Sequence, residues 1–336
     1  MTSTSLVTGG AGFMGSHVSG SLLKAGHDVV VLDDLSGGFI ENVPDEAEFV
    51  EGSAVDYRML RGLFAKHRFN YVFHLAAYAA EGLSHHIRRF NYENNIVASA
   101  GLISLAIEHR VSRFVFTSSI AVYGEAPLPM SEDMEMAPVD PYGIAKMAVE
   151  LDLAAAHRYF GLEFTIFRPH NVYGENQNIG DKYRNVVGIF MNQIMRSRPL
   201  TVFGDGTQTR AFSYIRDVAP IIAKSIELPE TRGEVYNVGS DQPHSVLKMA
   251  HVVSHAMGVE PRVEFLPERD EVTHAYSSHE KLRSIFKDEV STSLEEGIGA
   301  MAQWALKVGP RKGEPFDSIE VVRGLPASWE AGLGGA

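Results

Sequence analysis

Short apolar runs alternate with segments of helical spacing along most of the chain. Short runs of apolar residues predict buried strands, and apolar residues spaced three and four apart predict helices. The strand-like runs lie at 6–10, 28–34, 71–75, 113–117, 163–167, 201–203 and 235–238. The predicted helices lie between them at 13–26, 92–110, 142–160, 186–197 and 217–228. Continuous apolar strands that alternate with helices are typical of a parallel sheet covered on both faces, so we predict an α/β fold with a doubly wound sheet.

The pattern loosens after Arg168, and this change predicts a second, smaller α/β lobe. Residues 171–185 are polar and contain glycine, which is typical of a loop over a cleft. We therefore expect three parts: 1–170 with 212–240 as the larger domain, 171–211 with 241–312 as the smaller lobe, and 313–336 as a C-terminal tail with little pattern.

Composition narrows the classes of function. The 336 residues carry a formal net charge of -12 and show no basic patch, so we predict no nucleic-acid partner. The absence of cysteine excludes disulfides, thiolate nucleophiles and cysteine-based zinc sites. No signal peptide is visible, and no apolar stretch reaches the ~18 residues of a spanning helix. We expect a cytoplasmic enzyme with no metal and no membrane partner, which holds an anionic substrate through a few arginines and backbone amides.

Glycines 9, 12 and 15 stand where a predicted strand turns into a predicted helix. Glycine allows the tight turn and the close approach of a pyrophosphate, and the helix N-terminus offers free N–H groups. Asp33 ends the second strand, where a carboxylate accepts hydrogen bonds from ribose hydroxyls and repels a 2′-phosphate. The alternative is a glycine turn without a ligand and a loop carboxylate. Together the two signals predict a Rossmann-type domain that binds NAD in preference to NADP.

Tyr142 and Lys146 are one helical turn apart and project from the same face of a predicted helix. A cationic lysine beside a phenol favours phenolate, which would lower the pKa of Tyr142 and make it a general base. Pro141 suits the start of that helix. Ser119 follows an apolar strand, and ligands bind at the carboxyl ends of parallel strands. A Tyr-x-x-x-Lys pair and a strand-end hydroxyl can also be purely structural, but the three residues together predict a catalytic site.

These motifs, with His74-Leu75-Ala76-Ala77, resemble the extended short-chain dehydrogenase/reductase family. Within it the chain is most similar to the NAD-dependent nucleotide-sugar epimerases and dehydratases, above all to the UDP-glucose 4-epimerases. The resemblance covers residues 4 to about 310. It implies a catalytic set of Ser119, Tyr142 and Lys146, a nucleotide-sugar substrate, and a homodimer paired through the helices near 92–110 and 142–160. These helices carry apolar residues on more than one side: Ile96, Leu102, Ile103, Ala148, Leu151 and Ala155.

The resemblance also assigns binding residues. For the cofactor it implies Gly9, Gly12, Phe13, Met14, Gly15, Asp33, Asp34, Leu35, Ser36, Ser53, Ala54, Leu75, Ala76, Ala77, Asn95, Tyr142, Lys146 and His170. For the substrate it implies Ser119, Tyr142, Asn171, Asn185, Val186, Thr201, Phe203, Arg210 and Arg269. Thr201 and Phe203 fall where the family holds uracil, and Arg210 matches an arginine that binds the diphosphate.

Two departures define the expected reaction. The family's 4,6-dehydratases carry an Asp-Glu pair where this chain has Ile120 and Ala121, so elimination lacks its acids. What remains is oxidation at C4, rotation of the 4-keto sugar and return of the hydride, as in a UDP-glucose 4-epimerase. The alternatives are an NAD-dependent sugar or alcohol dehydrogenase or ketoreductase and a non-catalytic NAD-binding protein. One position in the family determines how large a substituent the site accepts at C2 of the sugar. An alignment without gaps places Ala275 there, and a shift of one residue places Tyr276 there.

Overall fold

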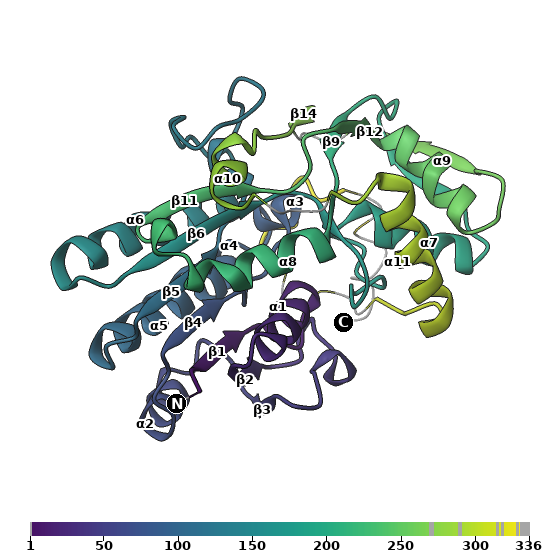
Figure 1. Cartoon of the computed structure of the whole chain (residues 1–336). Helices are drawn as coiled ribbons and strands as arrows, with labels where there is room; N and C mark the ends of the chain where they lie inside the picture. The colour runs from purple at the N-terminus through teal and green to yellow at the C-terminus, as the bar shows by residue number, and fades with distance from the viewer. Residues whose placement is uncertain are drawn as a thin grey trace.

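The computed structural model describes residues 2–268, 272–287, 291–313, 316, 319–326 and 329. At its centre is a seven-stranded parallel sheet in the order β11-β6-β5-β4-β1-β2-β3 (Figure 1). Its strands are β1 (Thr4–Thr8), β2 (Asp28–Asp33), β3 (Glu48–Glu51), β4 (Tyr71–His74), β5 (Arg113–Thr117), β6 (Phe164–Pro169) and β11 (Glu234–Val238). The predicted doubly wound Rossmann-type sheet is therefore confirmed.

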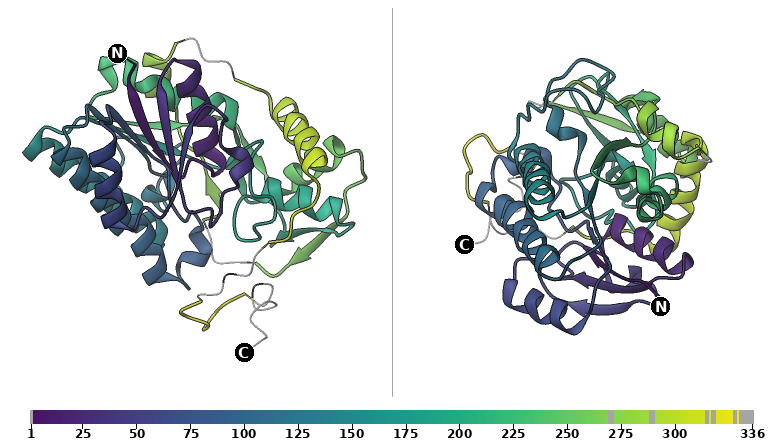
Figure 2. Two further views of the ribbon diagram at one scale, coloured as in Figure 1. Left: turned by 90° about the horizontal axis from the view of Figure 1, so that it is seen from below. Right: turned by 60° about the vertical axis from the view of Figure 1, so that its left-hand side comes forward.

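Helices cover both faces of this sheet (Figure 2). One face packs against α1 (Phe13–Lys24) and α8 (Ile215–Lys224), and the other against α2 (Tyr57–Lys66), α5 (Ala98–Glu108) and α6 (Pro141–Phe160). Successive side chains of a strand point to opposite faces, so Val7 joins the first layer and Leu6 the second. Burial from both sides explains why the strands read as continuous apolar runs rather than as alternating ones.

A second group of elements packs beside the sheet (Figure 1). Its helices are α7 (Val186–Met195), α9 (Val246–Ala256), α10 (Glu280–Ile285) and α11 (Leu294–Val308). Its short strands form three small sheets: β12 (Pro243–Ser245), β9 (Thr209–Ala211) and β14 (His274–Ala275); β13 (Val263–Leu266) and β8 (Leu200–Phe203); β10 (Ser213–Tyr214) and β7 (Val172–Tyr173). One apolar cluster runs from Val7 in β1 to Met301 in α11, so the two groups share a core.

Several predicted elements have different ends in the structure. The helix predicted at 92–110 begins earlier, with α4 (Arg88–Tyr92) and a π-helical turn at Glu93–Val97 before α5. The helix predicted at 217–228 is α8, which ends at Lys224 and is followed by a 3₁₀ turn, Ser225–Glu227. The other 3₁₀ turns are Ile40–Asn42, Ile120–Tyr123 and Pro229–Thr231, and a short helix, α3 (Glu81–Ser84), follows β4.

Described residues that follow α11 belong to an apolar cluster. Phe316, Ile319, Leu325 and Trp329 join an apolar cluster with side chains of α3 and α4. In the left view of Figure 2, the described segment 319–326 is drawn as a yellow trace near the bottom of the molecule. The described part of this segment therefore packs against the chain that follows β4, a packing that its sequence pattern did not predict. The boundaries 1–170, 171–211, 212–240 and 241–312 of the two predicted domains stay a prediction.

Candidate active site

A cleft of about 860 Å³ lies at the carboxyl ends of β1, β4, β5 and β6. One wall carries the glycine loop and Tyr142, and the facing wall carries Asn171, Thr201 and Phe203 from the second group of elements. Ligands of open parallel sheets bind outside the carboxyl ends of the strands. The cleft therefore lies where the sheet topology places a cofactor and a substrate together.

The glycine loop is shaped so that a ligand can approach its backbone. Gly9 has a φ of +70°, and a Cβ on it would lie 2.7 Å from the amide nitrogen of Ala76. A Cβ on Gly15 would lie 2.1 Å from the carbonyl oxygen of Gly9. The helix α1 begins at Gly12 without a side-chain cap. Its first N–H groups and its dipole are thus available to an anion, which fits the diphosphate of a dinucleotide.

Asp33 closes the loop from the end of β2. Its carboxylate accepts hydrogen bonds from the backbone N–H of Ala11 at 3.0 Å and of Leu35 at 2.8 Å. Burial raises the pKa of Asp33, while these two N–H groups oppose the rise. Asp33 lines the cleft, but its oxygens also hold the loop together. From the sequence, Asp33 was expected to accept hydrogen bonds only from the ribose of the cofactor.

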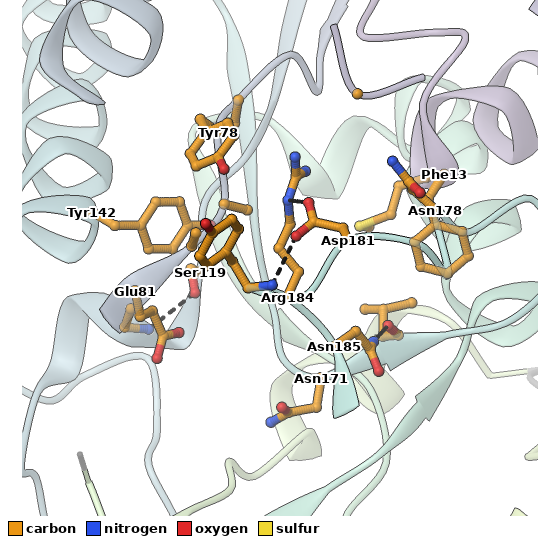
Figure 3. A pocket seen from close by; sticks show the side chains of 18 of the residues that line it. Phe13, Tyr78, Glu81, Ser119, Tyr142, Asn171, Asn178, Asp181, Arg184 and Asn185 are labelled. Carbon is orange, nitrogen blue, oxygen red and sulfur yellow. Dashed lines mark hydrogen bonds and ion pairs between the residues drawn. The ribbon is translucent and has the colours of Figure 1, made fainter. Parts of the chain in front are cut away.

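Helix α6 brings Tyr142 and Lys146 to the cleft beside Ser119 (Figure 3). Pro141 opens this helix, and the Asp140 carboxylate accepts hydrogen bonds from the N–H groups of Tyr142 and Gly143, both at 2.9 Å. Such a capped first turn fixes the start of a helix. Ser119 follows β5 and caps the 3₁₀ turn after it.

Gly143 permits this close packing of α6 on the turn after β5. A Cβ on Gly143 would lie 2.6 Å from the carbonyl oxygen of Ala121. Nothing in the one-turn spacing of Tyr142 and Lys146 announces this requirement. The absence of a side chain at Gly143 therefore helps to set the approach of Tyr142 to Ser119.

Burial is the largest influence on the pKa values of Tyr142 and Lys146. Burial raises the pKa of Tyr142, Glu81 and Asp140 raise it further, and Ser119 and Arg184 oppose the rise. Lys146 donates to the carbonyl oxygen of Thr117 at 2.7 Å, and its Nζ lies 5.7 Å from the centroid of the Tyr142 ring. Burial also lowers the pKa of Lys146 to about 7. Lys146 is not among the groups that oppose the rise in the pKa of Tyr142. The lowering of this pKa by Lys146 together with a positively charged nicotinamide stays a prediction for the complex with NAD.

A buried ion pair between Glu150 and Arg168 connects the elements that carry the catalytic residues. The Glu150 carboxylate of α6 accepts hydrogen bonds from the Arg168 guanidinium at 2.5 and 3.0 Å. Glu150 also accepts from Ser118 Oγ at 2.5 Å, and Arg168 donates to the Tyr123 hydroxyl at 2.7 Å. These contacts join α6 to the ends of β5 and β6. They hold in place the two elements that carry Tyr142 and Ser119.

His170 lines the cleft, but both of its ring nitrogens are engaged within the protein. Nδ1 donates to the carbonyl oxygen of Ala211 at 2.8 Å, and Nε2 lies 3.2 Å from Nε2 of His279. His279 in turn pairs with Asp241 at 2.6 Å. Burial lowers the pKa of His170 to about 3, so its ring is neutral. The predicted contact of His170 with the cofactor would therefore use the ring's carbon atoms rather than a free nitrogen.

Most of the predicted cofactor residues line the cleft. They are Gly9, Gly12, Phe13, Met14, Gly15, Asp33, Asp34, Ser36, Ser53, Ala54, Leu75, Ala76, Ala77, Tyr142, Lys146 and His170. Leu35 and Asn95 are not among the residues that line the cleft, so their contact with the cofactor stays a prediction. Leu35 has a φ of 58° and donates its N–H to Asp33, and the Asn95 amide donates to Asn91 at 2.8 Å and to the Tyr78 carbonyl at 3.3 Å. Both residues form hydrogen bonds to residues that line the cleft: Leu35 to Asp33 and Asn95 to Tyr78.

The predicted substrate residues also meet at the cleft. Its lining includes Ser119, Tyr142, Asn171, Asn185, Val186, Thr201, Phe203 and Arg210. Asn185 caps α7, and its side chain accepts from the N–H of Val187 at 3.1 Å. The Arg210 guanidinium donates to the backbone carbonyl oxygens of Thr209 and Thr273 at 2.9 Å and of Val272 at 2.5 Å. A diphosphate would have to share or displace these partners. Arg269 lies outside the described residues.

Several polar side chains that surround Tyr142 were not predicted from the sequence to lie in the cleft. Figure 3 shows Tyr78 and Glu81 on opposite sides of the pair of Tyr142 and Ser119, and Asp181 with Arg184 across from Tyr142. Arg184 pairs with Asp181 at 2.7 Å, and its guanidinium lies 4.6 Å from the centroid of the Tyr78 ring. Tyr78, Asp181 and Arg184 stand in irregular segments, and Glu81 stands in the four-residue helix α3. In segments of these kinds no periodic pattern marks a side chain as facing a cleft. The polar character of 171–185 was the only available signal.

Two searches of the described part of the chain add limits. None of its helices is both long enough and apolar enough to span a membrane. Among the same described residues, no group of three or more His, Asp or Glu side chains is arranged to hold a metal ion.

Comparison with known proteins identifies the family. The model of the NAD-dependent epimerase/dehydratase family matches residues 5–239. The chain belongs to this family. UDP-glucose 4-epimerase of Mycolicibacterium smegmatis is 33% identical over 307 residues, which cover 89% of this chain and 97% of the relative. The family assignment confirms the predicted enzyme class and the cofactor NAD.

Solved structures of family members agree. The structure of UDP-glucose 4-epimerase from Thermotoga maritima with UDP-glucose matches with a TM-score of 0.86 and 34% identity, over 91% of this chain and 99% of that chain. UDP-N-acetylglucosamine 4-epimerase from Methanobrevibacter ruminantium matches with a TM-score of 0.84 and 28% identity, over 92% and 100%. The glycine loop and the cleft fit NAD, because Gly9 and Gly15 let the loop pack tightly on its own backbone and on Ala76 while the first N–H groups of α1 stay available to the diphosphate.

Proposed function

We propose that this chain is an NAD-dependent 4-epimerase of UDP-linked sugars, of the UDP-glucose/UDP-galactose type. One observation carries the proposal: Ser119, Tyr142 and Lys146 meet in one cleft beside Ile120 and Ala121, which offer no acid. Elimination of water needs a general acid or base at the sugar's C5 and C6. Ser119 and Tyr142 suit proton transfer at a single hydroxyl, and this is the requirement of epimerisation at C4.

Each residue of the catalytic set has a role that its position supports. Tyr142 takes the proton of the C4 hydroxyl and later returns it, and Ser119 holds the C4 oxygen. Lys146 reaches the cleft from the turn below Tyr142 and binds the nicotinamide ribose in this assignment. Bound NAD supplies the acceptor and donor of the C4 hydride, and its positive nicotinamide ring favours the phenolate of Tyr142. That charge opposes the effect of burial on the pKa of Tyr142.

The far wall of the cleft suits the nucleotide. Thr201 and Phe203 stand on β8, where a planar base can lie against an aromatic ring. Arg210 and the N-terminus of α7, capped by Asn185, offer donors to a diphosphate. Rotation of the sugar requires that the nucleotide be held firmly while the sugar is held loosely. The polar groups of this wall serve the first requirement.

The same three catalytic residues would also serve a dehydrogenase or ketoreductase, so the fate of the C4 hydrogen is the decisive measurement. The experiment incubates the purified protein with UDP-glucose that carries deuterium at C4, without added NAD. We expect UDP-galactose with the deuterium retained at C4 and no free NADH. A control reaction contains the protein stripped of its NAD and should give no product until NAD is restored.

Other outcomes would replace the proposal. Release of one NADH for each keto product would make the chain a dehydrogenase. Uptake of solvent hydrogen at C3 or C5 would indicate epimerisation at another carbon and a different acid–base group. No reaction with any UDP-sugar, with NAD bound, would favour a protein that binds NAD without catalysis.

The sugar's C2 substituent has room in this cleft. Ala275 lines the cleft, whereas the Tyr276 backbone bonds to Met130 and its side chain is not among the lining residues. This placement supports the register in which the small residue faces C2. We therefore expect UDP-N-acetylglucosamine to be a substrate as well as UDP-glucose.

A single substitution tests this expectation. Ala275→Tyr should abolish turnover of UDP-N-acetylglucosamine and leave kcat/KM for UDP-glucose within about threefold, because only the N-acetyl group needs the space. The matched control is Tyr276→Phe, which should change neither substrate. Loss of both activities in Ala275→Tyr would mean that position 275 does not act on C2 alone.

Helices α5 and α6 supply the surface for the proposed homodimer. Leu102 and Ile103, which the sequence assigned to this surface, are instead buried inside the chain. Leu151 is 54% exposed, and Tyr159 and Phe160 near the end of the same helix are 82% and 61% exposed. Large exposed apolar side chains on one helix mark an interaction site. Pairing of two copies through these helices would cover them.

A further inference from the structure

Described residues after α11 pack against 78–90 and 182–183, two segments that line the cleft. We call these residues, Phe316, 319–326 and Trp329, the strap. The strap lies beyond residue 310, where the resemblance to the epimerases ends. Trp329 and Leu325 are nearly fully buried, with 5% and 6% exposure. A segment that buries such side chains is held by the protein rather than lying loosely on it.

The strap is fastened to the chain that follows β4. The N–H groups of Glu320 and Val321 donate to the carbonyl oxygen of His86 at 2.8 and 3.1 Å. The Glu320 carboxylate accepts from the N–H groups of Arg89 and Phe90, both at 2.8 Å, and so caps the first turn of α4. A carboxylate at a helix N-terminus satisfies donors that have no partner within the helix.

Aromatic side chains join the strap to two segments that line the cleft. The Phe316 ring lies 5.2 Å from Tyr78 and 5.0 Å from Phe90, centroid to centroid. The Trp329 ring meets Tyr183 edge-on at 5.2 Å, and the Trp329 carbonyl accepts from Lys182 Nζ at 3.4 Å. The strap thus links 78–90 to 182–183, which are separate in sequence.

Trp329 itself lines the cleft. A Cβ on Gly82 of α3 would lie 3.3 Å from the Trp329 ring, so the ring fits closely over this short helix. The preceding residue, Glu81, faces Tyr142 and raises its pKa. The helix also reaches Asp140, the cap of α6, through Ser84 Oγ at 3.4 Å. The strap is therefore connected to Tyr142 through α3.

We propose that the strap forms a wall of the sugar site, with Trp329 as a specificity-determining residue and Glu320 as a positioning residue. This inference rests on the proposed 4-epimerase function. Epimerisation requires that the 4-keto sugar turn over inside the site without leaving it. A wall braced by α3, α4 and 182–183 bounds the space in which the sugar turns and keeps the keto sugar in the cleft.

The test uses the full chain with four substitutions. Trp329→Ala should raise KM for UDP-glucose about tenfold, the equivalent of one lost aromatic contact, while the affinity for UDP alone stays unchanged. It should also release keto sugar, so that enzyme with bound NADH accumulates during turnover. Trp329→Phe should restore most of the wild-type KM. Glu320→Gln should give a smaller rise in KM, and the control Val322→Ala, at a strap position 57% exposed, should give none.

A second readout does not depend on activity. Amide hydrogen exchange in 78–92 should quicken in Trp329→Ala and Glu320→Gln and stay unchanged in Val322→Ala, because the strap's bonds hold this segment. Unchanged exchange together with unchanged KM in Trp329→Ala would overturn the inference. Faster exchange in a protein whose wild type turns over no UDP-sugar would instead overturn the proposed function and leave the strap as a brace of this wall.

Discussion

Tyr142 is a buried phenol, and in the proposed reaction it acts as the general base. Tyr142→Phe removes only the titrating oxygen, so kcat should fall about 10²–10⁴-fold while folding and NAD content remain. Tyr159→Phe, on the exposed surface of the same helix, is the matched control. Steady-state rates and the NAD content of the purified proteins measure both effects. Wild-type kcat in Tyr142→Phe would remove this residue from the mechanism.

The pH dependence of the reaction should report the same group. Burial raises the pKa of Tyr142, so the phenolate is the minor form near neutral pH and its share grows as pH rises. The rate of C4 oxidation in a single turnover should therefore increase with pH in the wild type. The residual rate of Tyr142→Phe should lack this increase. A wild-type rate that falls with rising pH would point to a general acid instead.

Asp33 should decide between NAD and NADP. Asp33→Asn keeps an acceptor for the N–H of Leu35 but removes the negative charge that a 2′-phosphate would meet. The affinity for NADP relative to NAD should rise about tenfold, measured by titration of the NAD-free protein. Stability should fall by about 1–3 kcal/mol, because the bond to Ala11 is lost. Asp28→Asn, at the exposed start of β2, should change neither quantity.

Contacts between residues that are distant in sequence could not be predicted from the sequence. Ser119, Tyr142 and Lys146 were predictable because strand ends and one-turn spacings are visible in a sequence. The bonds of Arg210 to Val272 and Thr273 were not, because the partners are backbone carbonyls 62 and 63 residues away. The neutral, engaged state of His170 depends likewise on His279. Such pairings follow from packing and leave no local pattern.

At the scale of elements, the buried pair of Glu150 and Arg168 joins α6 to β6. Glu150→Ala would leave the guanidinium buried without its carboxylate, which costs about 3–5 kcal/mol of unfolding free energy. Asp152→Ala, an exposed acid on α6, should cost less than about 0.5 kcal/mol. Denaturant unfolding of both variants gives the comparison. Equal stabilities would mean that the pair contributes nothing net.

The turn between β1 and α1 offers a second pair of matched variants. Gly15→Ala would place a Cβ 2.1 Å from the Gly9 carbonyl oxygen, so the glycine loop must open, with a loss of about 1–3 kcal/mol and more than about tenfold weaker NAD binding. Gly20→Ala, in the same helix, meets nothing within 4 Å and should stabilise the protein by about 0.5–1 kcal/mol. Intact NAD binding in Gly15→Ala would show that the loop tolerates a side chain.

Element prediction succeeded where periodicity was strong. Six of the seven strands of the large sheet and the long helices α1, α5 and α6 follow from apolar runs and helical spacing. The edge strand β3, which is only partly buried, and the helix α2 were not predicted. The short helix α3 and the strap did not follow, because four residues or an irregular segment carry no period. Their positions are set by burial of Leu83, Leu325 and Trp329 against one another. Tertiary packing, rather than local propensity, places them.

At the scale of the whole molecule, the homodimer and the cytoplasmic location stay predictions. Leu151→Asp places a charge on the exposed face of α6 and should turn the proposed dimer into a monomer. Leu306→Asp, 56% exposed on α11, should leave the dimer intact. Light scattering at micromolar concentration measures the mass of each protein. A monomeric wild type would contradict the proposed assembly.

The position of β11 at the edge of the sheet affects the order in which a newly synthesised chain can fold. β11 pairs with β6, although 64 residues separate Pro169 from Glu234. During translation β6 therefore leaves the ribosome with one open edge, and an unpaired apolar edge is prone to aggregation. We expect nascent chains to resist protease over the sheet only after residue 238 has emerged. Protection of shorter chains would show that the sheet forms without its last strand, while the edge of β6 is still open.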